Sequence, residues 1–265
     1  MAQSGGKGIG IIGLGTIAEF HARAIQAMEG GHLVCAYSRK GGEKADKFAN
    51  DFGVKVYSGD IDEFLQAPGL DVVTIATPSG AHLEPAVAAA RRKKHVLCEK
   101  PLEVTLERCD AMIEACRKNR VMLGGIFQNR SGGASQLIKS ALDKGRFGKL
   151  TVCSAIVPWW RTQAYYDSGG WRGTWGLDGG GALMNQSIHQ VDLLQWFAGP
   201  IAQLSSYAAC LAHKRIEVED AAVAAMRFKS GALGMVLGST AMYPGDAAEI
   251  HVSGDKGTAR WRAGH

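Results

Sequence analysis

The sequence lacks several features that define other classes of protein. Its 265 residues include no apolar run of the roughly eighteen residues that a membrane-spanning helix needs, and no signal-peptide pattern at the N-terminus. The six cysteines form no CxxC pair and no ligand-like spacing, so we expect reduced thiols and not disulfides or a zinc site. These absences predict a cytoplasmic protein with no metal site and no membrane segment.

A concentrated basic surface is also missing. The formal net charge is +5, and the one basic cluster, residues 91–94, ends a predicted helix, where cations suit the negative end of the helix dipole. We therefore expect no nucleic-acid partner. What the chain does have is 46% hydrophobic residues and 35 glycines, which predict a globular protein with loops that approach a ligand closely.

The first half of the chain alternates short apolar strands with helices, which predicts a doubly wound parallel sheet of the α/β class. We assign this domain to residues 1–127 and expect it to bind a dinucleotide. Strands are expected at residues 9–12, 32–37, 54–57, 70–76, 95–98 and 121–127, and helices at residues 16–28, 43–52, 61–65, 83–92 and 106–119.

A glycine-rich loop follows the first predicted strand. It reads Gly13-Leu14-Gly15-Thr16-Ile17-Ala18, a G-x-G-x-x-A motif between a strand and a helix. Gly13 permits the tight turn, Gly15 lets a pyrophosphate approach the backbone, and Ala18 allows close packing of the helix on the strand. The motif predicts that Gly13, Gly15, Thr16 and Ile17 bind a dinucleotide; the alternative is a glycine turn without a ligand.

The second predicted strand ends without an acidic residue. In NAD-binding domains an acid at this point usually binds the ribose 2′-hydroxyl. Here Ser38 and Arg39 follow the strand and suit a 2′-phosphate, and Arg39 is also able to stack on adenine. We therefore expect NADP to be favoured over NAD; the alternative is that Arg39 is an ordinary loop residue and that either cofactor binds.

A third strand end carries Thr77 and Pro78 on the same rim of the sheet as the glycine-rich loop. Ligands bind outside the carboxyl ends of parallel strands, so Thr77 and Pro78 are candidate cofactor contacts. His82 begins the helix that follows. It is either a helix-start residue or a neighbour of the ribose or nicotinamide.

The strand that begins at His95 stops abruptly at Glu99-Lys100-Pro101, because proline has no N–H to donate to the sheet. This placement at the mouth of the cleft predicts that Lys100 is a catalytic acid or base beside a nicotinamide ring. Glu99 is expected to orient Lys100 or the nicotinamide. The alternative is an exposed Glu99–Lys100 ion pair, which is common on protein surfaces and weak.

The pattern changes in residues 128–265, where strands follow one another with few helices between them. This predicts an α+β domain with a mostly antiparallel open sheet and helices on one face. Helices are expected at residues 135–144 and 182–198, and strands at residues 150–157, 203–211, 222–227, 233–239, 250–252 and 258–261.

The helix predicted after three glycines, Gly179–Gly181, carries a polar stripe. Asn185, His189 and Asp192 fall at i, i+4 and i+7 on a helix that is otherwise apolar, about 5–6 Å apart on one face. An imidazole between an amide and a carboxylate can be held in one tautomer and exchange a proton. The alternative is a histidine capped by Asp192 on a partly solvated face. The glycines allow a ligand or a neighbouring backbone to come close.

Taken together and in this order, the motifs resemble the Gfo/Idh/MocA oxidoreductase family. The residues that carry the resemblance are Gly13–Ala18, Thr77-Pro78, Glu99-Lys100-Pro101, Trp171-Arg172 and Gly179–Asp192. The resemblance implies a Rossmann domain followed by an α+β domain whose open sheet often forms an oligomer interface. It also implies hydride transfer between nicotinamide C4 and a carbinol carbon, usually of a sugar or cyclitol.

The resemblance assigns roles to individual residues. Lys100 matches the lysine that bridges the substrate hydroxyl and the cofactor, and His189 matches the usual acid/base histidine. Asn185 falls where many members carry aspartate, so a relay through position 185 is in doubt and His189 and Lys100 are left to share the proton. Trp171 and Arg172 match a pair that closes over the cofactor in some relatives, and Ser38-Arg39 resembles the NADP-preferring members.

We further expect the substrate to be a small sugar, glycoside or polyol. Arg161, Tyr166 and Trp175 are candidates for the sugar subsite, since aromatic faces suit sugar C–H surfaces; the alternative for each aromatic is packing in the core. In the expected reaction, we predict that His189 accepts the hydroxyl proton, Lys100 polarises the hydroxyl oxygen, and Asn185 binds a neighbouring hydroxyl.

Residues 128–265 are expected to form the substrate and oligomerisation domain of a dimer or tetramer. Family members typically continue for further strands beyond the last residue here, so we expect this domain to be C-terminally short. Three other functions stay open: an NAD-dependent glycosidase that uses transient oxidation, a non-catalytic dinucleotide-sensing regulator, and a carrier that binds through its open sheet.

Overall fold

The computed structural model describes residues 6–263, and the chain divides between Ile126 and Phe127 into two compact units. Each unit has its own sheet and its own buried core. The N-terminal unit contains the strands β1 (Lys7–Ile12), β2 (Gly31–Tyr37), β3 (Lys55–Tyr57), β4 (Val72–Ile75), β5 (His95–Cys98) and β6 (Leu123–Gly125). Its helices are α1 (Thr16–Ala27), α2 (Glu43–Phe52), α3 (Ile61–Leu65), η1 (Ser79–Ala81), α4 (Leu83–Arg91) and α5 (Leu106–Asn119).

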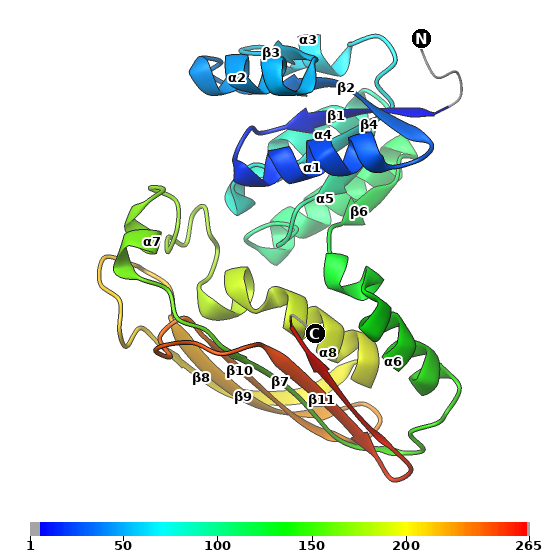
Figure 1. Ribbon diagram of the computed structural model, residues 1–265, viewed down its shortest axis with the longest axis vertical. Coiled ribbons are helices and arrows are strands. Elements are labelled where there is room, and N and C mark those ends of the chain that lie inside the picture. Colours follow the sequence, from blue (N-terminus) through cyan, green and yellow to red (C-terminus); the bar gives the residue numbers. More distant parts are fainter. Residues whose placement is uncertain (1–5, 264–265) are drawn as a thin grey trace. The chain divides into compact units, whose positions relative to one another are not determined.

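The sheet of the N-terminal unit has the order β3-β2-β1-β4-β5-β6, and every neighbouring pair is parallel. This is the doubly wound Rossmann order, in which the order of the strands reverses between β1 and β4. Figure 1 shows its strands and helices in blue to green. The predicted α/β fold is confirmed, and the carboxyl ends of β1, β4 and β5 lie next to one another.

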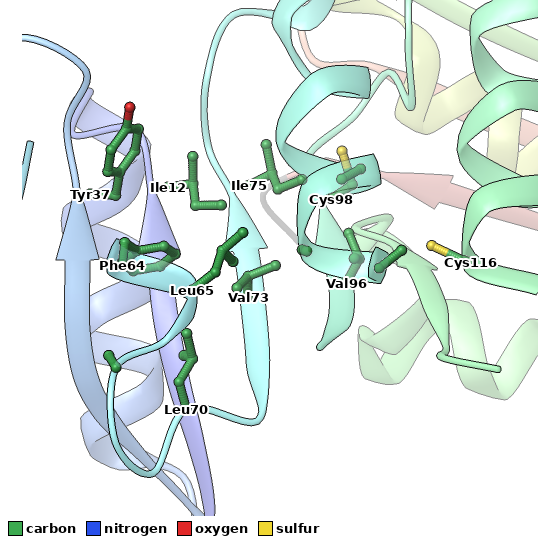
Figure 2. Close-up of a cluster of buried hydrophobic side chains, with 14 of the residues drawn as sticks. Ile12, Tyr37, Phe64, Leu65, Leu70, Val73, Ile75, Val96, Cys98 and Cys116 are labelled. Atoms are coloured by element: carbon green, nitrogen blue, oxygen red, sulfur yellow. The ribbon is translucent and has the colours of Figure 1, made fainter. Parts of the chain in front are cut away.

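Apolar residues from the strands pack under the helices of this unit. Figure 2 shows Ile12 and Tyr37 beside Phe64 and Leu65 of α3, which are 0% and 1% exposed. Val96 and Cys98 of β5 extend the same cluster toward α5. Burial of this extent anchors the strand ends from below, so the loops that follow them start from fixed positions.

The C-terminal unit is a second sheet with helices on one face (Figure 1). Its strand order is β12-β11-β7-β10-β9-β8, in which only β7 and β10 are parallel. The strands are β7 (Leu150–Pro158), β8 (Ile201–Ala209), β9 (Ala221–Phe228), β10 (Leu233–Ser239), β11 (Glu249–Gly254) and β12 (Thr258–Arg262). The helices are η2 (Gln128–Ser131), α6 (Gly133–Asp143), α7 (Gln163–Asp167), η3 (Ala182–Gln186) and α8 (Ile188–Ala198).

The two faces of this sheet differ. Inward residues such as Cys153 and Ala155 are buried against Leu193 and Leu194 of α8. On the outer face, Tyr207 is paired across the strands with Val223, and both side chains are exposed. The predicted open, mostly antiparallel sheet is thereby confirmed.

The prediction of one continuous helix over residues 182–198 is wrong. The segment begins as a π-helical turn, η3, and becomes an α-helix only after Ser187. The π-helical bond runs from the Ser187 N–H to the Ala182 carbonyl, five residues back, at 2.9 Å. The start of the turn is held by a contact distant in sequence: the backbone N–H of Ala182 donates to the Glu219 carbonyl at 2.9 Å, and the Glu219 carboxylate accepts from Gly181 and Leu183. Within residues 6–263, no helix is both long enough and apolar enough to cross a bilayer.

Candidate functional site

The glycine-rich loop joins β1 to α1 at the carboxyl edge of the first sheet. Gly13 has a φ of +91°, and a Cβ there would lie 2.9 Å from Cγ2 of Thr77, so the loop packs tightly on the end of β4. At Gly15 a Cβ would meet nothing within 4 Å. Gly15, Thr16 and Ile17 are exposed, whereas Ala18 is fully buried.

The N-terminus of α1 has no side-chain cap in the described chain, although α3 is capped by Asp60 and α5 by Thr105. Uncapped N–H groups at the positive end of a twelve-residue helix favour an anion. A pocket of about 250 Å³ adjoins this turn, and Lys44 and Lys47 of α2 line it together with Gly15 and Thr16. Two carboxylates, Glu19 and Asp51, also line it, and Asp51 pairs with Lys47. The loop and the helix end suit a phosphate group.

Ser38 and Arg39 follow β2. The backbone N–H of Ser38 donates to the Tyr57 carbonyl at 3.0 Å, and the Arg39 carbonyl accepts from Gly59 at 3.3 Å. The loop is thus tied to the end of β3, and the Arg39 side chain is exposed. This geometry leaves the guanidinium available to a ligand at the sheet edge.

The Glu99-Lys100 segment continues from β5 beside the end of β4. Cys98 is in register with Ile75, and the Glu99 N–H donates to the Ile75 carbonyl at 3.0 Å. Lys100 therefore lies on the same edge as Thr77 and the glycine-rich loop, since β1 is also in register with β4. The structure brings these sequence-predicted residues of the N-terminal unit together.

Glu99 is not an exposed surface residue. Its side chain is only 12% exposed and lies 2.9 Å from Nε2 of His21 on α1. Burial on its own would raise the pKa of the Glu99 carboxyl. Hydrogen bonds from His21 and from the Lys100 backbone N–H, together with the positive charges of these two side chains, hold the pKa below its usual value. Sequence reasoning missed His21, whose only signal is its position in the first helix after the glycine-rich loop.

His82 is 1% exposed and contacts backbone carbonyls on two loops. Nε2 lies 3.0 Å from the Thr77 oxygen, and Nδ1 lies 3.1 Å and 3.2 Å from the oxygens of Pro101 and Leu102. Thr77 itself donates through Oγ1 to the Ala81 carbonyl at 2.9 Å. His82 therefore lies below the surface of the unit, in a position that supports the two loops at the edge of the sheet.

The polar stripe of the C-terminal unit has partners that the sequence did not predict. Nε2 of His189 lies 3.3 Å from the Gln128 amide nitrogen, and its ring meets Phe127 edge to face. Asp192 pairs with Arg130 of η2 at 2.5 and 2.7 Å. Asp192 thus fixes η2 on α8, and η2 in turn presents Gln128 to His189.

A buried carboxylate lies beside Asn185. Asp178 is 2% exposed; one of its oxygens accepts from Asn185 Nδ2, and the other accepts from the Gly173 N–H at 2.8 Å. Asn185 itself is largely buried. Sequence analysis did not identify Asp178, because it lies in a glycine-rich turn without helical or strand periodicity. The carboxylate absent from position 185 is therefore present seven residues earlier.

Residues 159–175, called the aromatic segment here, are rich in tryptophan and tyrosine. Two arginines of this segment lie over its rings. Arg161 lies 5.1 Å from the Trp159 ring centre and donates to Gln186, the neighbour of Asn185, at 3.0 Å. Arg172 lies 4.8 Å over Tyr165 and 5.0 Å over Trp171.

Two other predicted residues of this segment differ in exposure. Tyr166 is buried, with its hydroxyl 2.7 Å from Thr240 Oγ1 and its ring against His213, so it packs in the core. Trp175 is 57% exposed, and its backbone N–H donates to Glu217 at 2.8 Å.

The amino-acid sequence matches two family models that together cover both units. Residues 7–126 match the oxidoreductase family with an NAD-binding Rossmann fold, and residues 135–260 match the GFO/IDH/MocA C-terminal domain. The chain belongs to the Gfo/Idh/MocA oxidoreductase family. The resemblance in the sequence motifs is confirmed.

Relatives in this family act on sugars and cyclitols. The myo-inositol 2-dehydrogenase of Thermotoga maritima is 30% identical over 94% of this chain and 73% of its own length. The 1,5-anhydro-D-fructose reductase of Ensifer adhaerens is 31% identical over 84% of this chain and 66% of its own length. The structure of the WlbA dehydrogenase of Bordetella pertussis, in complex with NADH and UDP-GlcNAcA, matches with a TM-score of 0.91. It is 36% identical, over 96% of this chain and 77% of its own.

The N-terminal unit of this Gfo/Idh/MocA protein suits NAD(H) on its own geometry. The uncapped end of α1 and the open face of Gly15 would hold the pyrophosphate. Ser38 and Arg39 would face the adenosine ribose, and the segment carrying Lys100 would face the nicotinamide side. The unit itself matches the family description of an NAD-binding Rossmann fold.

Proposed function

We propose that the chain transfers hydride between NAD(H) and the carbinol or keto carbon of a sugar or cyclitol. The observation that carries this proposal is the shared sheet edge on which an uncapped helix N-terminus and Lys100 meet, in a unit that matches an NAD-binding oxidoreductase model. When bound, the nicotinamide supplies the hydride donor or acceptor. The protein supplies orientation, proton transfer and exclusion of water.

In this proposal Lys100 contacts the substrate oxygen and polarises it, and His189 accepts the hydroxyl proton. A lysine is a poor base near neutrality, whereas a histidine exchanges protons there. Asn185 donates to a neighbouring hydroxyl, and the buried Asp178 fixes the orientation of its amide.

The substrate class is also a proposal. Arg161 and Trp175, with Trp171 and Arg172 near them, suit a ligand that offers ring C–H faces and an anionic group. The relative from Bordetella pertussis holds UDP-GlcNAcA, which carries both. We therefore rank a nucleotide-linked sugar acid first, followed by inositols and anhydro sugars.

Three further proposals concern the form of the cofactor, the oligomeric state and the cellular compartment. Exposed Arg39 at a strand end without an acid favours NADP over NAD. The outer face of the second sheet favours a dimer or tetramer, and six free cysteines suit the reducing cytoplasm.

The test is turnover with a substrate panel, followed by absorbance of the reduced nicotinamide. The panel holds UDP-linked sugar acids, myo-inositol, scyllo-inositol and anhydro sugars, each with NAD and with NADP. We expect at least one substrate to be oxidised, and Lys100→Met to lower kcat by roughly a hundredfold or more while NADH still binds. Full turnover by Lys100→Met would show that the catalytic residue is assigned wrongly. NADH binding without turnover on any substrate would favour the sensing regulator.

A further inference from the structure

Two histidines from different helices hold the backbone on either side of Lys100. His21 lies on α1 and reaches the residue before Lys100, and His82 lies at the start of α4 and reaches the residues after it. Both histidines belong to the N-terminal unit.

The His21 ring connects two strand ends. Nε2 lies 2.9 Å from Oε1 of Glu99, and Nδ1 lies 3.0 Å from Oγ1 of Thr74, which is buried. The other Glu99 oxygen, Oε2, accepts from the backbone N–H of Lys100 at 3.1 Å. The carboxylate is thus held at both oxygens, once by a helix and once by the backbone of Lys100.

The His82 ring connects the segment after Lys100 to the end of β4. Its nitrogens contact the carbonyl oxygens of Thr77, Pro101 and Leu102 at 3.0 to 3.2 Å. Carbonyl oxygens only accept hydrogen bonds, so the ring must donate; a neutral imidazole donates from one nitrogen only, to one of the two segments, and a protonated ring donates to both. Because His82 is 1% exposed, water does not compete for these bonds.

A buried carboxylate secures the position of His82. The Glu103 side chain is fully buried and accepts from the backbone N–H of Leu83, the residue after His82, at 3.1 Å. It also accepts from Val104 at 2.7 Å and pairs with Arg108 at 2.9 Å. The start of α4 and the segment from Lys100 to Val104 are therefore tied together twice.

We propose that His21 and His82 are positioning residues for Lys100. They fix the backbone on both sides of a long, flexible side chain, so that its ammonium group meets the substrate oxygen in one geometry. The inference rests on the proposed function, in which Lys100 contacts that oxygen. It names two residues that act through Lys100 and do not touch the substrate.

The first test compares His21→Leu with His21→Gln and with His32→Leu. His32 is an exposed histidine on β2 in the same unit, so its replacement is the matched control. We expect His21→Leu to lower kcat roughly 10- to 100-fold, because misplacing a reacting group by about 1 Å costs a factor of this size. NADH affinity should match the control, whereas the thermal midpoint should fall, because the largely buried Glu99 carboxylate loses a hydrogen-bond partner. His21→Gln keeps a donor for Glu99 and should recover part of the rate.

The second test is the pH profile of kcat/KM. The titratable groups around the Glu99 carboxylate are His21 from α1 and, on its own segment, Cys98 and Lys100. Burial remains when His21 is removed, but a hydrogen bond that lowers the pKa of Glu99 is lost. That pKa therefore rises, so the further loss of rate that follows protonation of Glu99, on the acidic side of the limb set by His189, begins at higher pH in His21→Leu. A purely structural loss would lower the whole profile without moving the limb.

The His82 contacts are tested by His82→Gln and His82→Ala. The amide of Gln still donates to the carbonyls, so kcat should fall more in His82→Ala than in His82→Gln. If His82→Ala does not fold, the His21 variants decide, because the His21 side chain is partly exposed.

Lys100→Met separates the inference from the proposed function. If Lys100→Met keeps full turnover, the role of Lys100 in the proposed function fails. If Lys100→Met is inactive while His21→Leu equals His32→Leu in kcat and in its acidic limb, the inference is wrong and the proposed function stands. Inactive Lys100→Met with a slowed, limb-shifted His21→Leu supports both.

Discussion

At the residue scale, position 185 carries an amide where the family resemblance of the sequence led us to expect a carboxylate. The structure places the buried carboxylate of Asp178 against that amide, with its second oxygen on the Gly173 N–H. The Asp178–Asn185 pair therefore contains a carboxylate, and the Asn185 amide is a hydrogen-bond donor whose direction Asp178 fixes. Asp178 links the turn that follows Trp171 and Arg172 to the π-helical turn that contains Asn185.

We predict that Asp178→Asn lowers kcat by about tenfold and the free energy of unfolding by about 1.5–3 kcal/mol, the usual worth of hydrogen bonds to a charged group. The new amide still accepts from Gly173, but an amide on each side of the pair weakens the orientation of Asn185. Turnover and urea unfolding measure the two effects. Asp167→Asn, an exposed carboxylate paired with Arg215, is the control. Wild-type values for both quantities in Asp178→Asn would contradict the assignment.

A second buried acid, Asp220, sets part of the pH dependence of stability. It is 0% exposed, accepts from the backbone N–H groups of Leu211, Ala212 and His213, and lies 2.8 Å from Nδ1 of His213. Burial alone would raise the pKa of Asp220, but these hydrogen bonds hold it below its usual value. The folded-state pKa is thus lower than the unfolded-state pKa of about 3.9.

This sign predicts a stability contribution that is complete above the unfolded-state pKa and is lost as pH falls through the folded-state pKa. Asp220→Asn should cost about 3 kcal/mol at neutral pH, because it leaves buried donors and His213 without the charge they face. The difference from wild type should shrink below about pH 4. Urea unfolding from neutral to acidic pH measures it. A difference that stays constant with pH would show that the charge of Asp220 is not the cause.

At the scale of single elements, η3 depends on a close backbone contact. A Cβ on Gly181 would lie 1.7 Å from the carbonyl oxygen of Glu219, and that carbonyl accepts the Ala182 N–H. The sequence suggested that the three glycines allow a ligand or a backbone to approach. At Gly181 the structure shows a backbone.

Gly181→Ala should therefore destabilise the protein by about 3 kcal/mol, near the upper end for overpacking, and should lower turnover because Asn185 lies in the displaced turn. Gly176→Ala is the matched control in the same segment, since a Cβ there meets nothing within 4 Å and the cost should stay within about 0.5 kcal/mol. Thermal and urea unfolding compare the two. Equal stability of both variants would contradict the close contact.

Patterns within an element were predictable, and contacts between distant elements were not. The strand–helix alternation and the glycine motif depend on local periodicity, so they predicted the Rossmann order and the edge that carries Lys100. Glu99 is paired with His21, 78 residues away in the chain, and Asp192 with Arg130, 62 residues away. Asn185 is paired with Asp178, which lies seven residues away but in a different turn. No periodicity encodes such pairs. The contact of Glu219 with the start of η3 was missed for the same reason.

At the scale of the whole molecule, the outer face of the second sheet is a large exposed surface. Tyr207 is 82% exposed and Val223 46%, and they form one row across β8 and β9 that continues through Leu237 to Ile156. Leu233 and Met235 are exposed on the same face. Contiguous apolar surface of this kind usually marks a protein interface.

A second copy of the chain is the partner we propose for this face. Wild-type protein should sediment as a dimer or tetramer, and Tyr207→Glu should shift it toward the monomer, because a charge would be buried at the interface. Leu106→Glu, at an apolar residue 79% exposed on α5, should leave the assembly unchanged. Analytical ultracentrifugation measures both. A monomeric wild type, or an unchanged assembly in Tyr207→Glu, would contradict the proposal.

The central claim is direct hydride transfer between the nicotinamide and a substrate carbon. It is tested by reducing the keto form of the best substrate with NADH that carries deuterium at both C4 positions, and by mass analysis of the product. The account predicts one deuterium on the carbinol carbon, formed by the wild type and lost in Lys100→Met. A product without deuterium, or label released to water, would contradict it.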